Sequence, residues 1–380
     1  MHPSDLPRPD STALAASRAL LDRIEAQLAA HGNWISFARY MDIALYEPGL
    51  GYYGGAKAPF GAGGDFVTAP ELSPLFARTL ARQVAELLGP GDVVLEFGAG
   101  SGALAEQLLQ ALAELGCTEA PYLILETSAG LRARQQERLG TSARWIGRLP
   151  QRFRGVMLAN EVVDAMPVHA LAWTQRGILE RGVCANEGEL AWSDRPAQGE
   201  VLAAAREVDL VPPDAGRYES EVSLAAPGWV RAVADSLERG ALIVIDYGFP
   251  RHEYYHPQRS SGTLMCHYRH RAHSDPFYLP GLQDITAHVD FSALAQSASS
   301  TGLEILGYAG QAQFLVNCGI TELLAEADAS DVRRYAPLAA AANRLLSPAE
   351  MGELFKVFAV GRGIDKALLG FAQGDRAHVL

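Results

Sequence analysis

The chain has 380 residues, of which 48% are hydrophobic and 20% are charged, and its formal net charge at pH 7 is −12. A chain of this length and apolar content buries a large core, as two or three domains or as one elaborated α/β domain. The negative charge argues against nucleic acid or an anionic membrane as the main partner, because both attract clustered Lys and Arg side chains. An acidic surface suits a cationic partner instead.

The N-terminal residues, MHPSDLPRPDSTALAAS, contain no basic stretch followed by an apolar one, and no window of the chain approaches the length of a membrane span. We therefore expect a cytoplasmic protein without membrane insertion. The four cysteines are scattered without C-x-x-C spacing, so the sequence indicates neither a disulfide framework nor a zinc site.

Two amphipathic helices are predicted near the N-terminus. Apolar residues at helical spacing predict the first over residues 12–30, ending at Gly32, and the second over residues 71–89, ending at Gly89. Between them, residues 49–68 read GLGYYGGAKAPFGAGGDFVT. Glycine is costly to order, and this stretch carries aromatic residues in place of the serines of a flexible linker. We interpret it as a loop that closes on a ligand.

Short apolar runs alternate with helical stretches from residue 92 onward. The runs are DVVLEF (92–97), YLILE (122–126), GVMLAN (155–160) and ALIVIDY (241–247). Runs that are apolar on both faces are typical of parallel strands covered by helices on each side, so this part predicts βαβ units. Residues 170–218 interrupt the alternation with strand patterns joined by turns, which predicts an antiparallel insertion.

Two patterns follow towards the C-terminus. LEILGYAG (303–310) and AQFLVN (312–317) suggest a closing hairpin. The stretch SPAEMGELFKVFAVGRG (347–363) opens with Ser, Pro and Glu in N-cap, N1 and N3 positions, and it contains a glycine near its end. These signals predict a helix.

A glycine turn, FGAGSGALAE, joins the first strong strand to a helix. Gly98, Gly100 and Gly102 let the backbone bend sharply and let a carboxylate or phosphate approach the helix N-terminus. The same letters satisfy two patterns: the G-x-G-x-G of the S-adenosylmethionine (SAM) site in Rossmann-like methyltransferases and, with Ala103, the looser dinucleotide pattern. Glu126 ends the second strand, where it accepts hydrogen bonds from a ribose diol in either case or is a simple surface acid.

Two features favour SAM over a dinucleotide. Glu96 precedes the glycines, where its carboxylate would oppose a pyrophosphate but pair with the α-ammonium of a methionine moiety. Asn160 ends the run GVMLAN, and Glu161 and Asp164 follow it at the rim of the sheet; hydride transfer has no evident need for these acids. Carboxylates suit a guanidinium substrate, so Glu161 and Asp164 are the candidate catalytic residues. Alternatively, Asp164 caps a turn before Pro167 and Glu161 is only a solvated neighbour.

Other polar residues near strand ends are candidates for the substrate site. Asp246 and Tyr247 end the run ALIVIDY, although an acid beside Gly248 is often only a turn former. HYRHRAH (267–273) offers three histidines, but interleaved arginines would repel a metal ion and no carboxylate stands at ligand spacing. We expect no metal there and interpret the segment as a polar face.

QDITAHVDF (283–291) alternates polar and apolar residues. This period of two would put Asp284 and His288 on one face of an extended segment, as a second wall of the substrate site with His288 as a candidate base. The alternative is an amphipathic edge strand in which Asp290 caps the next helix.

Several stretches occur in a familiar order along residues 30–360. The stretches GLGYYG, GGDFVTAPELS, LEFGAGSGALA, ANEVVDAMPVH, IDYG, GTLMCHYRHRAH, QDITAHVDF and PAEMGELFKV resemble the MidA-like family of SAM-dependent methyltransferases. The resemblance implies an α/β, Rossmann-like class I methyltransferase fold with a mostly parallel seven-stranded sheet, added N-terminal and C-terminal helices and a β insertion. Because mitochondrial members are assembly factors of respiratory complex I, it also implies methylation of an arginine in a complex I type subunit.

The resemblance also implies a set of cofactor-binding residues. The glycine turn would hold SAM, Glu126 its ribose, and the GGDFVT stretch would close over the methionine end, unless that stretch is only a turn packed by Phe66. The expected cofactor residues are Glu96, Gly98, Gly100, Gly102, Glu126, Asn160, Gly64, Asp65 and Thr68.

We therefore expect three consecutive parts: N-terminal helices with a glycine-rich lid over 1–90, a SAM-binding core over 91–320 that carries the insertion, and a C-terminal helical segment over 321–380 that packs on the core. The expected function is that of a SAM-dependent protein methyltransferase whose protein partner is a respiratory complex subunit, with no nucleic acid partner. Two alternatives stay open: a dinucleotide-binding oxidoreductase, and a SAM-binding assembly factor without catalysis whose insertion docks a partner.

Overall fold

A computed structural model describes residues 6–55, 68–208, 210 and 216–380. The chain forms two compact units: unit 1 comprises Met1–Phe66, Asp164–Gly228 and Arg251–His288, and unit 2 comprises Val67–Val163, Trp229–Pro250 and Val289–Leu380. These units differ from the three consecutive ranges expected from the sequence, because each unit is assembled from three separate stretches of chain. The predicted insertion falls within the middle stretch of unit 1.

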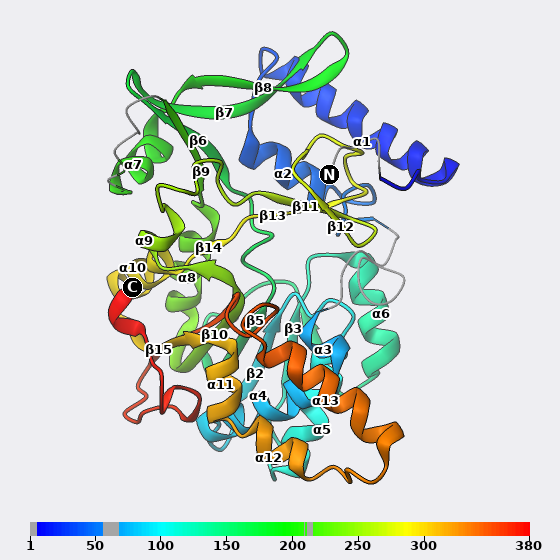
Figure 1. The fold of residues 1–380 in the computed structure, drawn as a ribbon, viewed down its shortest axis with the longest axis vertical. Coiled ribbons are helices and arrows are strands. Elements are labelled where there is room, and N and C mark those ends of the chain that lie inside the picture. Colours follow the sequence, from blue (N-terminus) through cyan, green and yellow to red (C-terminus); the bar gives the residue numbers. More distant parts are fainter. Residues whose placement is uncertain (1–5, 56–67, 209, 211–215) are drawn as a thin grey trace. The chain divides into compact units, whose positions relative to one another are not determined.

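Unit 2 is built on a mixed sheet whose order, among the described strands, is β15-β16-β10-β5-β2-β3-β4, with β14 paired to β10 (Figure 1). The pairs that join β4, β3, β2, β5 and β10 are parallel, whereas β16 runs antiparallel to both β10 and β15. The strands are β2 (Val93–Phe97), β3 (Tyr122–Leu125), β4 (Arg144–Ile146), β5 (Phe153–Asn160), β10 (Leu237–Phe249), β14 (Val289–Asp290), β15 (Glu304–Gly310) and β16 (Phe355–Arg362). The prediction of a mostly parallel, Rossmann-like sheet is confirmed.

The central strands are apolar on both faces because both faces are covered. Alternate residues of β2, β5 and β10, such as Val94, Val156 and Ile243, share one core cluster with α4 and α5. The intervening residues are equally buried. These intervening residues lie on the other face of the sheet, where Phe358 of β16 contacts Phe291 of α10. This arrangement is the one expected for continuous apolar runs in parallel strands.

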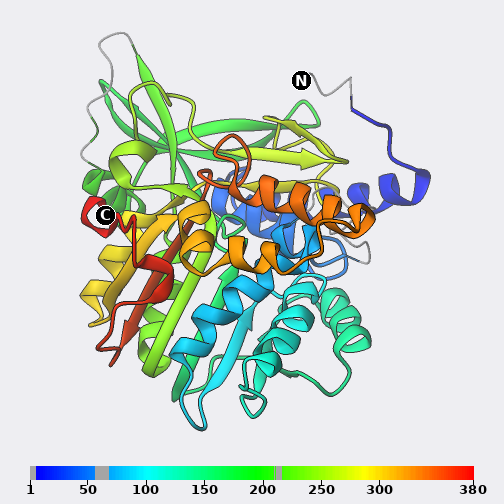
Figure 2. The same cartoon turned by 60° about the horizontal axis from the view of Figure 1, so that its bottom comes forward.

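The helices of unit 2 alternate with strands in the middle of the unit, as in βαβ units, and also stand before its first strand and between the antiparallel strands β15 and β16. They are α3 (Ala69–Leu72), α4 (Pro74–Leu87), α5 (Ala103–Glu114), α6 (Ala129–Leu139), α10 (Phe291–Ser300), α11 (Gln311–Asn317), α12 (Ile320–Ala325) and α13 (Val332–Leu346), with 3-10 turns at Leu369–Phe371 and Ala377–Val379. Helix α8 (Ala225–Ser236) begins in unit 1 and ends in unit 2. Figure 2 shows α12 and α13 beside α4, although both helices are far from α4 in the sequence.

Two predicted elements near the C-terminus are wrong. AQFLVN forms α11, and β15 pairs with β16 instead of with it. Residues 347–354 form turns, and the run from Phe355 is β16, buried at every position before Arg362. Pairing with β10 and β15 on its two sides therefore outweighs the local helix signals. The C-terminal segment expected to be helical supplies a central strand as well as helices.

Unit 1 begins with the predicted N-terminal helix. Helix α1 (Ser11–Ala30) is capped by Asp10, whose carboxylate accepts a hydrogen bond from the Ala13 amide at 2.8 Å. Its buried face packs in one cluster with α2. The other elements of the unit are β1 (Ile35–Ser36), α2 (Phe37–Tyr46), β6 (His169–Thr174), β7 (Gly177–Asn186), β8 (Glu189–Pro196), α7 (Gly199–Glu207), β9 (Arg217–Val222), α9 (Arg251–Tyr254), β11 (Met265–Tyr268), β12 (Arg271–His273) and β13 (Asp284–Thr286).

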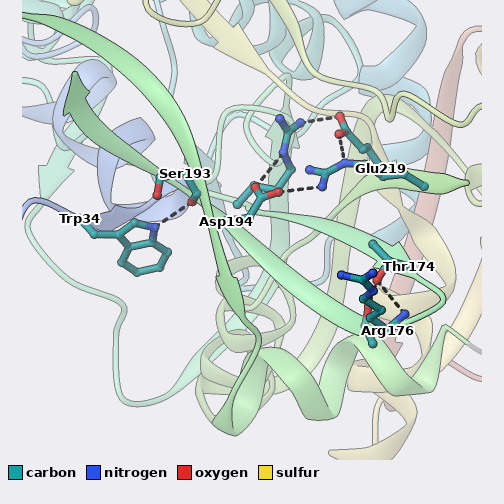
Figure 3. A network of polar contacts seen from close by, with 9 residues as sticks. Trp34, Thr174, Arg176, Ser193, Asp194 and Glu219 are labelled. Carbon is teal, nitrogen blue, oxygen red and sulfur yellow. Dashed lines mark hydrogen bonds and ion pairs between the residues drawn. The ribbon is translucent and has the colours of Figure 1, made fainter. Parts of the chain in front are cut away.

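The predicted antiparallel insertion is confirmed, with the addition of α7 between its strands. β6, β7, β8 and β9 pair antiparallel, and a ring of charges ties β7, β8 and β9 together (Figure 3). Arg181 and Arg217 each pair with both Asp194 and Glu219. Such a partly buried network holds the strands in register better than isolated surface pairs do.

Within the described ranges, none of the helices has the length and hydropathy that would let it cross a bilayer.

Candidate cofactor-binding site

The glycine turn between β2 and α5 has the backbone that the sequence predicts. Gly98, Gly100 and Gly102 have φ values of +55°, +54° and +79°, in the left-handed region that residues with a Cβ atom rarely adopt. A Cβ atom at Gly98 would also lie 3.2 Å from Cγ2 of Val162, in the loop after β5. Gly102 is the N-cap of α5 and gives its first turn no side-chain cap, so the helix end suits an anionic ligand group.

Two neighbouring helices brace this turn. Ser101 donates its hydroxyl proton to Glu71 of α3. Arg138 of α6 donates through Nη1 to the Ser101 carbonyl at 3.0 Å. Its Nε also lies 3.5 Å from Oε2 of Glu106 on α5, which makes an ion pair. Sequence reasoning missed Glu71 and Arg138, because neither stands in the glycine motif and both reach it through packing of α3 and α6.

Glu126 follows β3 with its carboxylate held in place. Oε1 accepts from the Ser128 amide at 2.9 Å, and Oε2 accepts from Nε2 of Gln135 at 2.9 Å. Burial raises the pKa of Glu126, and the donors at Ser128 and Gln135 oppose that increase. The Thr127 amide is a further hydrogen-bond donor to this carboxylate. A carboxylate accepts about four hydrogen bonds, so Glu126 keeps capacity for a diol ligand and is held too firmly for a simple surface acid.

Gln135 is a third residue that sequence reasoning missed. It is fully buried on α6, where Nε2 also donates to the Gly100 carbonyl at 2.9 Å and Oε1 accepts from Nε1 of Trp145 at 2.9 Å. Leu131, Gln135 and Leu139 follow helical spacing on the buried face of α6. A polar residue at an apolar position of that face was the signal that could have pointed to it.

Glu96 lies on β2 with only 3% of its surface exposed. Its Oε2 accepts a hydrogen bond from the Tyr122 hydroxyl at 2.7 Å. Burial raises the pKa of Glu96 to about 7; the Tyr122 hydrogen bond opposes this, and the charge of Glu126 adds to it. The carboxyl group is therefore poised to ionise near neutral pH, and an approaching cation would favour its charged form.

The loop after β5 is held by Asp246. This fully buried carboxylate accepts through Oδ2 from the amides of Val162 at 3.2 Å and Val163 at 2.8 Å, and through Oδ1 from the Tyr247 amide at 2.9 Å. Glu161 has a φ of +54°, a strained value for a residue with a side chain. Its amide donates to the Ile245 carbonyl at 2.9 Å. These hydrogen bonds hold Glu161 in a strained backbone conformation that costs about 1–3 kcal/mol. Residues with such strain cluster at functional sites.

Asn160 offers a specific indication of a ligand. Its Nδ2 donates to Oε1 of Glu161 at 3.2 Å. Its Oδ1 is buried and has no partner among the residues that the structure describes. Buried polar atoms are normally satisfied, so a donor from a bound molecule fits here. Asn160 and Glu161 therefore lie together at the end of β5. Tyr247 has a different neighbour: the centroid of its ring lies 3.9 Å from the ring centroid of Phe355.

Asp164 and Asp284 belong to unit 1, where both surround Tyr53. The Tyr53 hydroxyl donates to Oδ1 of Asp284 at 3.0 Å. Burial raises the pKa of Tyr53 well above its usual value, and the charges of Asp284 and Asp164 add to it. Tyr53, which lies within the glycine-rich stretch 49–68, is thus a neighbour of two predicted acids. Nothing in the sequence spacing indicated this.

QDITAHVDF does not form one extended strand. Asp284 is in β13, which pairs with β11, whereas Val289 and Asp290 form β14, which pairs with β10. The capping by Asp290 that belonged to the alternative interpretation is confirmed, because its Oδ1 accepts from the Ala293 amide at 3.1 Å at the start of α10. The His288 amide donates to Oγ1 of Thr263 at 3.0 Å.

The remaining predicted residues are Gly64, Asp65, Thr68 and the HYRHRAH segment. Gly64 and Asp65 lie outside the described residues. Thr68 is the N-cap of α3, where its side chain makes no cap hydrogen bond. HYRHRAH forms most of the hairpin of β11 and β12. In the parts of the chain that the structure describes, no group of three or more His, Cys, Asp or Glu side chains is arranged to hold a metal ion.

Comparisons with known proteins identify the family of this chain. The sequence model of a family of S-adenosyl-L-methionine-dependent methyltransferases matches residues 75–309. The chain is 30% identical to the mitochondrial protein arginine methyltransferase NDUFAF7 of Danio rerio, over 90% of this chain and 87% of that protein. It is 29% identical to the Homo sapiens protein of the same name, over 86% of this chain and 80% of that protein.

A solved structure extends the likeness to the cofactor. A crystal structure from Burkholderia thailandensis, bound to S-adenosyl-homocysteine (SAH), is 52% identical with a TM-score of 0.93, and the alignment covers 99% of this chain and 100% of that chain. SAM is therefore the cofactor, which favours the first of the two patterns that the glycine turn satisfied. The expectation of a cytoplasmic protein is wrong on these comparisons, because the curated relatives are mitochondrial proteins.

Proposed function

Because this chain belongs to the Methyltransf_28 family of S-adenosyl-L-methionine-dependent methyltransferases, we propose that it transfers the SAM methyl group to an arginine side chain of a protein. The expected MidA-like family, the fold and the SAM cofactor are confirmed, and a dinucleotide oxidoreductase is not supported. The arginine specificity rests on the curated relatives, which are named protein arginine methyltransferases. The observation in this chain that carries the proposal is the fixed turn of Asn160 and Glu161.

The proposed reaction is an in-line displacement. A guanidino nitrogen of the substrate attacks the methyl carbon, and the carbon–sulfur bond breaks with its electron pair passing to sulfur. The products are SAH and a methylated guanidinium, after the nitrogen has lost one proton to a carboxylate or to water. The chain must therefore hold the guanidinium in line and offset its positive charge.

We assign that orienting role to Glu161. Its backbone is held by the bonds that Asp246 makes to the following amides, so its carboxylate is presented with little freedom. Asp164 and Asp284, beside Tyr53 in unit 1, are further acids proposed for the substrate, and His288 is kept as the candidate base. The role proposed for Asp246 is to position Glu161.

The proposed cofactor contacts follow from the same geometry. Gly100 presents its backbone amide to the methionine carboxylate, and Glu126 accepts from the ribose hydroxyls. Gly98 and Gly102 shape the turn, because their amides donate to the carbonyls of Leu125 and Ala99. The unpaired Oδ1 of Asn160 accepts from a donor on the cofactor. Glu96 pairs with the α-ammonium group once its carboxyl has ionised. Thr68, the N-cap of α3, is proposed to contact the methionine end. Gly64 and Asp65, which lie outside the described residues, are also proposed as cofactor residues.

The pairing of Glu96 with an ammonium group predicts a pH dependence. Since the pKa of Glu96 is about 7 without a cation, SAH binding should release a proton, and its affinity should fall as the pH drops from 8 to 6, by at most about tenfold per pH unit. Tyr122→Phe removes the donor that favours the ionised form, so it should move this dependence to higher pH. Calorimetric titration in buffers of different ionisation enthalpy measures both affinity and proton release.

Glu96→Gln is the control for that experiment, because it keeps the shape of the side chain and cannot ionise. Its affinity should vary less with pH than that of the wild type. The same slope in both proteins would show that another group carries the effect. The stability of the protein without ligand should depend on pH in the opposite direction to the affinity. The folded state holds the Glu96 proton to higher pH than the unfolded chain does, so the contribution of Glu96 to the free energy of unfolding is lost as the pH rises from about 4.5 to about 7.

The proposed substrate is tested by methyl labelling. Incubation with isotopically labelled SAM and a lysate from cells that lack this gene should label a protein, and mass spectrometry should find methylarginine. We propose a respiratory complex subunit as that protein, on the strength of the MidA-like resemblance. Label on another residue type would refute the arginine proposal. SAH binding without any labelled protein would support the alternative of a non-catalytic assembly factor.

A further inference from the structure

We propose that Gln135 is a positioning residue that sets the spacing between the glycine turn and Glu126 and thereby the affinity for SAM. Its amide nitrogen bridges the two: one N–H bond reaches the Gly100 carbonyl and the other reaches Oε2 of Glu126, both at 2.9 Å. The inference depends on the proposed cofactor contacts of Gly100 and Glu126, and it is independent of which side chain is methylated.

The orientation of the Gln135 amide is itself fixed. Oε1 accepts from the indole Nε1 of Trp145 on β4 at 2.9 Å. If the amide were turned over, its NH₂ group would face the indole N–H, and its oxygen would face the carbonyl and the carboxylate. The three partners thus agree on one orientation, in which all the polar atoms of the side chain are used.

Burial makes this bridge difficult to replace. Gln135 has no exposed surface, and its Cγ would lie 3.6 Å from a Cβ atom placed at Gly102, so α6 packs directly on the turn. Loss of the amide would leave the Gly100 carbonyl and Oε2 of Glu126 each without this donor. An apolar residue would satisfy the helix face equally well, so packing alone does not explain a glutamine between Leu131 and Leu139.

The bridge has a consequence for binding because SAM is one molecule with two polar ends. The glycine turn is proposed to hold the amino acid end and Glu126 the ribose. The distance between the two protein groups must match the distance between the two ligand groups, and each departure weakens both contacts together. A single side chain that bonds to both groups fixes that distance before the ligand arrives.

The test compares Gln135→Met and Gln135→Glu with the wild type by calorimetric titration with SAH. Gln135→Met keeps the length and loses the donors, so the affinity should fall by about tenfold to 100-fold. In the methylation assay, the KM for SAM should rise with little change in kcat at saturating SAM. Gln136→Met is the matched control: Gln136 is the next residue of α6, exposed to solvent, and its change should leave the affinity unaltered.

Gln135→Glu gives a readout that a purely structural role would not move. Its carboxyl group would face the Glu126 carboxylate, so one of the pair should hold a proton to a raised pKa. The protonated group again donates one hydrogen bond. The affinity of Gln135→Glu relative to wild type at the same pH should therefore recover as the pH falls. A wild-type Kd for Gln135→Met, or a relative affinity of Gln135→Glu that does not change with pH, would overturn the proposal.

Discussion

Gly100→Val is expected to abolish SAH binding, with a loss in affinity of at least about 100-fold, or about 2.8 kcal/mol. Gly100 has a φ of +54°, and a β-branched residue is an outlier in this region. The turn would have to rearrange, and its amides and the Gly100 carbonyl bonded to Gln135 would move with it. Calorimetric titration with SAH measures the loss.

The fold should survive this change. Local backbone strain costs about 1–3 kcal/mol, whereas a folded protein has about 5–15 kcal/mol of stability. Gly116→Val is the matched control, because Gly116 also has a left-handed φ, +83°, and a Cβ atom there would meet no other atom within 4 Å. Gly116→Val should lose stability by a similar amount and keep its affinity for SAH. Retained SAH affinity in a folded Gly100→Val protein would refute the assignment of the glycine turn.

Glu161→Gln is expected to suppress methyl transfer by about 100-fold or more while SAH binds as in the wild type. The substitution preserves the shape of the side chain and removes the charge that offsets the guanidinium. The turn itself should persist, since the bonds from Asp246 reach the amides of Val162 and Val163 and do not involve the Glu161 carboxylate. Initial rates with labelled SAM, together with an SAH titration, separate the two effects.

The control for Glu161→Gln is Glu137→Gln, a change of the same chemistry at an exposed position of α6. It should leave both turnover and binding unaltered. Unchanged turnover in Glu161→Gln would move the catalytic role elsewhere, and Asp164→Asn would be the next variant to measure. Loss of SAH binding in Glu161→Gln would instead identify Glu161 as a cofactor residue.

The parts of the site that the sequence predicts are those with local causes. Three glycines in the left-handed region stand two residues apart because the turn itself requires them, so spacing alone identifies them. The apolar runs of β2, β5 and β10 predict buried strands because both faces are covered. Asp290 caps α10 through a bond to a residue three positions away, which is within reach of sequence reasoning.

The parts that could not be predicted depend on distant segments. Gln135 reaches the Gly100 carbonyl across 35 positions, and Tyr122 reaches Glu96 across 26. The helix signals before β16 are real local signals, but the two strands that flank it decide the outcome. The alternation in QDITAHVDF predicts one extended segment, but the segment forms two short strands that join different sheets and ends at the start of α10.

The most direct test is a crystal structure of this protein with SAH. The account predicts the methionine carboxylate at the amides between Gly98 and Gly102, and the ribose hydroxyls within hydrogen-bond distance of Glu126. SAH bound away from the turn, or with its ribose turned away from Glu126, would contradict it.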